Sequence, residues 1–336
     1  MVTAANPHAV DAAIAMLEKG GHAVDAAIAA HAVLGLVEPQ SSGLGGGAFM
    51  LVYQRADGDL SFLDGRESAP AGATVDMFVR DGQVMDFRQA WQSGLAVGVP
   101  GAVALYKRAH DEFGKLSWAE LFEPAINLAE QGFAVSPRMA KSLEFVAPLG
   151  RLDDNPATAA YFYPGGKPLP VGHLLKNPDY AATLRRITLE GIDAFYTGEI
   201  AAAIARAAQE GPDGGTLTVE DIANYEVIER PVICGGFRVL EICTTSPPSS
   251  GVAQIMIAGI YDHLASDASE QADKVAAFVD AQRLAYADRD HYIGDPKSVT
   301  VPLQDLVVPA YLKHRAGERI APGDIPRHGD PGAVLH

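Results

Sequence analysis

A dense group of glycines, followed by a strand that is apolar on both faces, constrains this chain more than any other feature. Four of the five residues from 43 to 47 are glycines, and residues 48–54 then read Ala-Phe-Met-Leu-Val-Tyr-Gln. A strand with this pattern is expected to be covered on both faces. Asp57 and Gly58 suit a hairpin turn before a return strand over 60–63. Buried strands between helices indicate a layered α/β architecture.

The glycines do not match a nucleotide-binding loop. A P-loop would need Lys and Ser or Thr after the last glycine, but Ala48 and Phe49 follow here. A dinucleotide-binding loop would need a helix next, whereas the pattern predicts a strand. The glycines therefore indicate a turn that requires positive φ angles or a close approach of backbones.

The return strand delivers Arg66 to a loop, next to Asp64 and Glu67. A guanidinium group offers a planar fork that can hold a carboxylate through two hydrogen bonds. Arg66 is therefore the leading candidate for recognising an acidic ligand. An internal ion pair between Arg66 and either acidic neighbour is an equally open interpretation at this point.

The first helices have clear local signals. Asn6 can cap a helix that begins with Pro7, and an alanine-rich helix runs from about Ala23 to just before Pro39. The first helix carries an apolar stripe at helical spacing, formed by Val10, Ile14 and Leu17. Because alanines allow helices to approach closely, we expect these two helices to pack tightly.

The remaining elements follow from the same rules. Residues 98–210 read as mainly helical, and two further helices are expected over about 252–263 and 272–292. A second pair of strands is expected over 227–234 and 237–243, turning at Gly235 and Gly236. That turn would pair position 234 with 237 and leave Cys243 far from Cys234. We therefore expect no disulfide, only two small buried side chains.

Charge and composition exclude several classes of partner. A net charge of −16 argues against nucleic acid and anionic membrane surfaces, which are polyanions. No window approaches the roughly 18 apolar residues of a membrane span. One acidic cluster could suggest a metal, but consecutive helical residues point in different directions, so capping and ion pairs explain it better. That cluster is Asp288, Arg289, Asp290, His291 and Asp295. No metal or cofactor is expected.

Taken together, these segments resemble the large subunit of γ-glutamyltransferases, which are N-terminal nucleophile hydrolases. The matching motifs occur in the family's order: 20–27, 38–50, 66–70, 98–101, 247–251, 285–289 and 294–296. The resemblance implies an α/β (α+β) fold, a four-layer αββα sandwich completed by a small-subunit chain from the same precursor. Residues 1–336 would form a single domain, with 303–336 as an extended tail towards the cleavage site.

The resemblance also implies the chemistry. In the family, a threonine at the start of the small subunit attacks the γ-glutamyl amide, and its own α-amine serves as the base. This chain has no Thr-Thr-His motif and its last threonine is Thr300, so no catalytic residue is expected in it. Arg66 matches the position that binds the α-carboxylate of the glutamyl group. Glu67 is a secondary candidate that would orient Arg66.

We therefore expect the large subunit of a γ-glutamyltransferase, or glutathione hydrolase, which acts on glutathione-like amides and passes the γ-glutamyl group to water or an amino acid. Ser246 and Val252 depart from the family's motif and leave the acyl specificity open. One alternative is a sister acylase or amidohydrolase that acts on another carboxylate-bearing amide. The other is a scaffold subunit without turnover. The resemblance implies a periplasmic or secreted protein, although residues 1–20 contain no export leader and a cytoplasmic location remains open.

Overall fold

The computed structural model describes residues 1–149, 152, 155–211, 213–266, 268–318, 320–321 and 323–335. Contacts divide the chain into two compact units. The first unit comprises Met1–Ala48 and Asp64–Ile228, and the second comprises Phe49–Leu63 and Glu229–His336. The single domain expected over residues 1–336 remains a prediction for the assembled protein.

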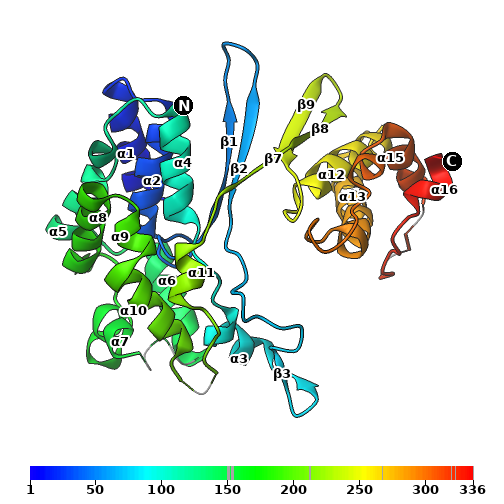
Figure 1. Ribbon diagram of the computed structural model, residues 1–336. Coiled ribbons are helices and arrows are strands. Elements are labelled where there is room, and N and C mark those ends of the chain that lie inside the picture. The colour runs from blue at the N-terminus through cyan, green and yellow to red at the C-terminus, as the bar shows by residue number, and fades with distance from the viewer. Residues whose placement is uncertain are drawn as a thin grey trace. The chain divides into compact units, whose positions relative to one another are not determined.

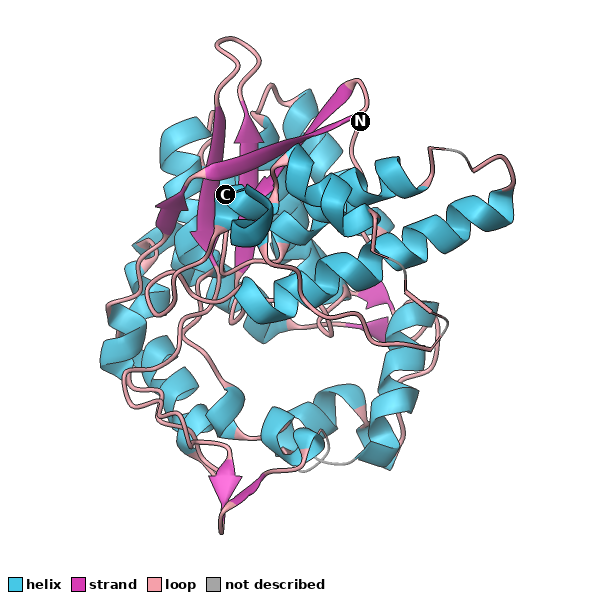
Figure 2. Cartoon of the chain, turned by 90° about the vertical axis from the view of Figure 1, so that its right-hand side faces the viewer, coloured by secondary structure: helices cyan, strands magenta, loops and turns pink. Residues whose placement is uncertain are grey.

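The first unit consists mostly of helices (Figures 1 and 2). Its helices are α1 Pro7–Glu18, α2 Ala23–Val37, α3 Phe87–Trp91, α4 Ala102–Phe113, α5 Glu123–Gln131, α6 Pro137–Val146, α7 Pro156–Phe162, α8 Pro178–Glu190, α9 Asp193–Tyr196, α10 Gly198–Gln209 and α11 Val219–Ala223. Its short strands are β3 Val79–Arg80, β4 Gln83–Val84, β5 Phe133–Ala134 and β6 Leu174–Leu175, which form the antiparallel pairs β3–β4 and β5–β6. The predicted helical character of 98–210 is confirmed.

Helices α1 and α2 begin where the sequence predicts. The side chain of Asn6 accepts a hydrogen bond from the backbone N of His8, as expected of an N-cap. The buried face of α1 differs from the predicted stripe, because Ile14 and Leu17 are 40% and 39% exposed. The helix instead buries Ala9, Ala12, Ala13 and Met16. Small side chains let α1 and α2 approach closely, and this packing decides which face is covered.

The first hairpin is formed by β1 (Ala48–Tyr53) and β2 (Leu60–Gly65). Gly58 adopts a φ angle of 82° in the turn, and the three-stranded sheet has the order β1–β2–β7, with β7 at Ile228–Arg230. The prediction that β1 is covered on both faces is wrong for this chain. Val52 is only 6% exposed, but Leu51 and Tyr53 are 39% and 63% exposed. Leu51 and Tyr53 lie on the same face of the sheet, because side chains two residues apart on a strand point the same way, and this face is left uncovered.

The second unit packs helices against a hairpin. Its further strands are β8 Val232–Phe237 and β9 Leu240–Thr245, and its helices are α12 Gly251–Leu264, α13 Gln271–Tyr292, α14 Leu303–Leu306, α15 Pro309–Ala316 and α16 Pro331–Leu335. The predicted helices over 252–263 and 272–292 are confirmed. The core of the unit is formed mainly by side chains from α12, α13 and α15, such as Ile255, Leu284 and Leu312. In the described part of the chain, no helix combines the length and the apolar content that a membrane crossing requires.

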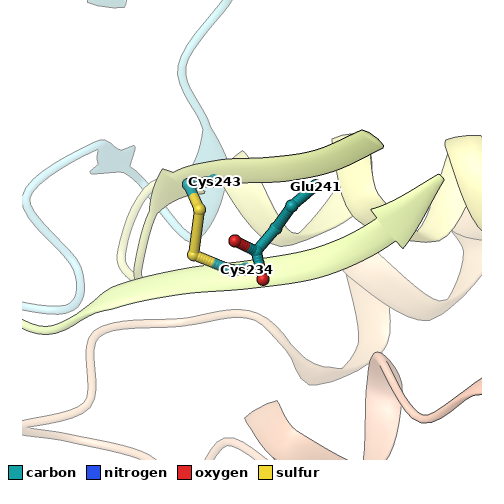
Figure 3. A group of neighbouring side chains, drawn as sticks. All are labelled: Cys234, Glu241 and Cys243. Carbon is teal, nitrogen blue, oxygen red and sulfur yellow. A yellow bond between two sulfur atoms is a disulfide. The ribbon is translucent and has the colours of Figure 1, made fainter. Parts of the chain in front are cut away.

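The β8–β9 hairpin corrects two predictions. The strands turn at Arg238 and Val239, and Arg238 takes a φ angle of 55° there. Cys234 consequently lies directly opposite Cys243, and the two form a disulfide (Figure 3). Gly235 serves close packing instead of a turn, since a β-carbon there would lie 2.2 Å from Ile255 Cγ2 of α12. A glycine required by packing resembles a turn glycine in the sequence, so the predicted register was wrong.

The segment 303–336, which was expected to be an extended tail, contains three helices where the structure describes it. Helices α14, α15 and α16 lie within it, and Leu306, Tyr311 and Leu312 are buried. The expectation of an extended conformation is therefore wrong for these helices. Their apolar side chains bury surface in the core of the second unit, which an extended segment would leave exposed.

Candidate functional site

The glycine-rich turn before β1 packs against two other segments of the first unit. The carbonyl oxygen of Gly46 accepts hydrogen bonds from the backbone N atoms of Gly101 and Ala102, both at 3.0 Å. These donors lie at the start of α4, where helical N–H groups have no partner within the helix. The turn therefore caps α4 through its backbone and fixes its own position relative to that helix.

Gly47 allows this turn to approach the Arg66 loop closely. A β-carbon at Gly47 would lie 2.7 Å from Glu67 Oε2, 2.7 Å from the Gly65 carbonyl oxygen and 2.8 Å from the Arg66 Cα. Contacts this short cannot accommodate a side chain. The glycines were expected to serve either a positive φ angle or a close approach of backbones. Gly47 does not have a positive φ angle, so close approach is the reason at this position.

Arg66 lies one residue beyond β2, on a backbone that is fixed on both sides. Its N donates to Oδ1 of the buried Asp64 at 3.0 Å, and its carbonyl oxygen accepts from the Tyr225 hydroxyl at 2.7 Å. Ser68, two residues after Arg66, is held as well, because its carbonyl oxygen accepts a hydrogen bond from Val99 N at 2.8 Å. The Arg66 side chain is exposed. The loop is thus rigid in its backbone and carries an accessible guanidinium group.

Glu67 lies beside the glycine turn. A β-carbon at Gly98 would be 2.9 Å from the Glu67 Cβ, so the stem of this side chain packs along residue 98. A β-carbon at Gly46 would lie 3.5 Å from Glu67 Oε1, and one at Gly47 would lie 2.7 Å from Glu67 Oε2. Glu67 therefore contacts the turn that approaches Arg66, and its predicted role in orienting Arg66 remains a prediction.

A second anchor of the same loop comes from α11. The backbone N of Ala71 donates to Oδ1 of Asp221 at 2.9 Å, while Oδ2 of Asp221 accepts from the N and hydroxyl of Thr218. The bond from Ala71 N, followed by the bond from the Thr218 side chain, lowers the pKa of Asp221 below its ordinary value. Hydrogen bonds to the ionised form favour that form, so this carboxylate stays charged while it holds the loop.

Tyr225, Asp221 and the role of Gly101 were not predicted from the sequence. Tyr225 is separated from Arg66 by 159 residues, and Asp221 is separated from Ala71 by 150. No local spacing connects residues so far apart. The available signals were weaker: a capping pattern at Thr218 and Asp221, and a Gly-Val-Pro-Gly motif at 98–101 whose contacts could not be derived.

Within the described residues, the candidate metal-ligand cluster is Cys234, Glu241 and Cys243, whose ligand atoms lie within 4.8 Å of one another. Figure 3 shows the carboxylate of Glu241 beside the two bonded sulfur atoms. A metal would need thiolates, and the disulfide removes both. This cluster therefore offers no thiolate ligand.

The acidic cluster on α13 is occupied by ion pairs and hydrogen bonds, as predicted. Asp288 is fully buried; its Oδ2 accepts from Arg315 Nε at 3.0 Å and from the Tyr311 hydroxyl at 2.9 Å. Its Oδ1 accepts from the backbone N of Gly329 at 2.7 Å. Burial and the nearby charge of Asp288 raise the pKa of Tyr311, so its hydroxyl remains a donor. Arg289 and Asp290 form a further ion pair.

The family model for gamma-glutamyltranspeptidase matches residues 9–326 of this chain. The chain belongs to the gamma-glutamyltranspeptidase family. The glutathione hydrolase proenzyme of Bacillus subtilis (strain 168) is 38% identical over 320 residues, which cover 94% of this chain and 54% of that protein. The acylase ACY 1 proenzyme of Pseudomonas sp. (strain SE83) is 37% identical over 325 residues, covering 94% and 57%.

Structural similarity agrees with this family. The crystal structure of Helicobacter pylori gamma-glutamyltranspeptidase matches with a TM-score of 0.89 and 33% identity, covering 97% of this chain and 94% of that chain. The predicted fold class, mixed helix and sheet of the N-terminal nucleophile hydrolase type, is therefore confirmed. The chain spans about half the length of the curated relatives it matches, and these are named proenzymes.

Proposed function

We propose that this chain is the large subunit of an enzyme that hydrolyses or transfers γ-glutamyl groups from glutathione-like amides. The observation that carries the proposal is Arg66: its side chain is exposed, while its backbone is held by Asp64 and Tyr225. In a member of the gamma-glutamyltranspeptidase family, such a group suits the α-carboxylate of a glutamyl substrate. Because the backbone is already fixed, binding needs to order only the Arg66 side chain and not the loop.

The proposed reaction requires a second chain from the same precursor. Its N-terminal threonine hydroxyl attacks the amide carbonyl, and the α-amine accepts the hydroxyl proton and returns it to the leaving amine. An ester between the threonine and the γ-glutamyl group then remains, and water or an amino acid releases it. Arg66 would hold the substrate during both steps, and Glu67 would support the position of Arg66.

Two observations support this partner. The curated relatives are proenzymes of about twice this length. Leu51 and Tyr53 on β1 are exposed apolar side chains, which a neighbouring sheet of an αββα sandwich would cover. We further propose that the two chains form one domain and that the segment beyond α15 leads to the cleavage site.

The disulfide bears on the compartment. Disulfides persist mainly in oxidising compartments such as the periplasm and the extracellular space. The Cys234–Cys243 bond therefore supports a periplasmic or secreted location. Alkylation of free thiols in freshly lysed cells tests this, because a cytoplasmic protein would react at both cysteines.

A second candidate function is an acylase that acts on another carboxylate-bearing amide. The identity of 37% to an acylase proenzyme favours keeping this candidate. Arg66 fits either substrate class, since both present a carboxylate.

The deciding experiment uses the two-chain protein and three anilides. γ-Glutamyl anilide is the proposed substrate, γ-aminobutyryl anilide lacks only its α-carboxylate, and glutaryl anilide lacks only its α-amine. Release of aniline from γ-glutamyl anilide, with a large loss when the α-carboxylate is removed, supports the proposal. Preference for glutaryl anilide supports the acylase, and inertness towards all three supports a scaffold subunit.

A further inference from the structure

The hydroxyl of Tyr225 bonds directly to the peptide that carries Arg66. We propose that Tyr225 is a positioning residue that sets the orientation of Arg66 and thereby the affinity for the substrate α-carboxylate. The inference rests on the proposed function and deepens it, because it names a residue that would act on the substrate only through Arg66. Its physical basis is the 2.7 Å hydrogen bond from the Tyr225 hydroxyl to the Arg66 carbonyl oxygen.

The approach of Tyr225 to this peptide depends on a glycine. A β-carbon at Gly101 would lie 2.2 Å from the Tyr225 oxygen and 2.2 Å from the Gly65 carbonyl oxygen. Gly101 also donates its N to the carbonyl oxygen of Gly46 in the glycine turn. The tyrosine, the turn and the start of α4 therefore meet at the backbone of residues 65 and 66.

The ring of Tyr225 is itself held in place. It stacks on Tyr196 with a centroid distance of 6.1 Å and an interplanar angle of 17°. The Tyr196 hydroxyl donates to the Pro100 carbonyl oxygen and accepts from Ala104 N, both at 3.0 Å. Burial raises the pKa of Tyr196, so this hydroxyl keeps the proton that it donates. The stack thus ties Tyr225 to the first turn of α4.

The segment that contains Tyr225 holds the loop at two points. Tyr225 bonds to Arg66, and Asp221 bonds to the N of Ala71, five residues further along the loop. Asp221 is also the N3 residue of the capping box that starts α11, so its side chain has a defined direction. A short segment late in the first unit therefore fixes both ends of the segment 66–71.

The position of the Arg66 peptide affects substrate binding because a guanidinium–carboxylate pair is planar and makes two bonds. A shift of the backbone misaligns both bonds at once. Loss of one neutral hydrogen bond corresponds to about a three- to tenfold change in an equilibrium constant. We expect Tyr225→Phe to raise KM for γ-glutamyl anilide by about this factor and to leave kcat within about twofold. Phenylalanine keeps the stack on Tyr196 and removes only the hydroxyl.

The experiment uses the full precursor after it has been processed into two chains. Tyr225→Phe is compared with Tyr163→Phe, a matched control that removes a hydrogen bond to the Leu143 carbonyl oxygen in another part of the first unit. Both variants lose one tyrosine-to-carbonyl bond, so both can lower stability. Only Tyr225→Phe should raise KM and weaken the binding of L-glutamate measured by calorimetry.

A double-mutant cycle with Arg66→Lys separates a positioning role from a general structural one. If Tyr225 acts through Arg66, Tyr225→Phe should weaken L-glutamate binding in the wild type and have little further effect in Arg66→Lys. The calorimetric measurement keeps the cycle interpretable even if Arg66→Lys has too little activity to assay.

Two results would overturn the inference alone: equal weakening of binding in both backgrounds, or no weakening in the wild type while Arg66→Lys has its expected effect. If Arg66→Lys changed neither KM nor L-glutamate binding, both the inference and the assignment of Arg66 in the proposed function would be overturned. The two failures are therefore distinguishable in one set of measurements.

Discussion

Arg66 in the first unit is exposed on a rigid loop, whereas Arg315 in the second unit is fully buried. The guanidinium group of Arg315 donates to Asp288, to the Leu284 carbonyl oxygen and to the Arg327 carbonyl oxygen, and it pairs with Glu318. Its donors are used within the fold. Around Arg66 the peptide backbone makes the named contacts, through Asp64 and Tyr225.

The difference shows how the same side chain can serve two purposes. A buried arginine must have its charge and donors satisfied internally, because an unpaired buried charge is costly. An arginine that recognises a ligand needs a fixed backbone and an accessible head group. Fixing the main chain sets where the Arg66 side chain starts, and the cost of ordering the loop is met during folding.

The largest effect is expected for Arg315→Met. We expect this variant to lose about 3–5 kcal/mol of stability, because Asp288 would remain buried without its cation. Arg238→Met is the control, since Arg238 forms an exposed pair with Asp262 whose loss should cost about 0–1 kcal/mol. Urea unfolding of both variants measures the difference. Similar midpoints for the two would show that the buried pair is not a special contributor.

Removing the disulfide measures how much it contributes to the free energy of unfolding of the second unit. Replacing Cys234 and Cys243 by serine should cost about 2–3 kcal/mol, because the bond closes a loop with a sequence separation of 9. Urea unfolding is measured with and without reductant. The wild type should shift on reduction and the double variant should not. An unshifted wild type, once thiol titration has confirmed reduction, would remove the disulfide from the stability of this unit.

Arg66→Lys tests the exposed side of the comparison. We expect KM for γ-glutamyl anilide to rise about ten- to a hundredfold, because lysine cannot reproduce the two-bond fork and charged hydrogen bonds contribute about 1.5–3 kcal/mol. The free energy of unfolding should change by less than about 0.5 kcal/mol, as for most exposed substitutions. Steady-state kinetics and urea unfolding give the two values. Unchanged kinetics would exclude Arg66 from the substrate site.

The smallest effect on stability is expected for Asp221→Asn, which removes the charge of the carboxylate that holds the Arg66 loop. The pKa of Asp221 is lowered in the folded protein, so its stabilising contribution is complete above the unfolded value of about 3.9 and is lost as the pH falls through the folded pKa. Asp221→Asn should cost at most about 1 kcal/mol near pH 7, because water screens this partly exposed group. Thermal unfolding between pH 5 and pH 3 should show a smaller loss of stability in the variant than in the wild type. Equal losses would contradict a charged anchor.

Much of the local structure followed from the sequence. Asn6 with Pro7 predicted the start of α1, Asp57 with Gly58 predicted the first hairpin, and the strand after it placed Arg66 in a loop. These signals depend on backbone angles and hydrogen bonds within a few residues, which side-chain type controls directly. The family likewise followed from several short motifs in a fixed order, and the match over residues 9–326 agrees.

The features that were predicted wrongly depend on packing against other elements, not on neighbours in the chain. The register of the β8–β9 hairpin was wrong because Gly235 is required by the approach of Ile255, a residue on another element. The apolar stripe of α1 likewise does not mark its buried face, since Ile14 is exposed while Ala9, Ala12 and Ala13 are buried. In both cases a neighbouring surface decided the outcome, and a single segment of sequence carries no record of that surface.

The residues along the chain are enough to predict where most helices and strands begin, which loop carries the Arg66 guanidinium group, and which family the chain belongs to. The contacts of Tyr225 and Asp221 with that loop, the pairing of Cys234 with Cys243, and the ion pair between Arg315 and Asp288 became visible only in the folded chain. The first set depends on interactions between neighbours in the chain. The second depends on segments brought together by packing, in the case of the loop across 150 residues or more, and packing selects among many pairings that local propensity leaves equal.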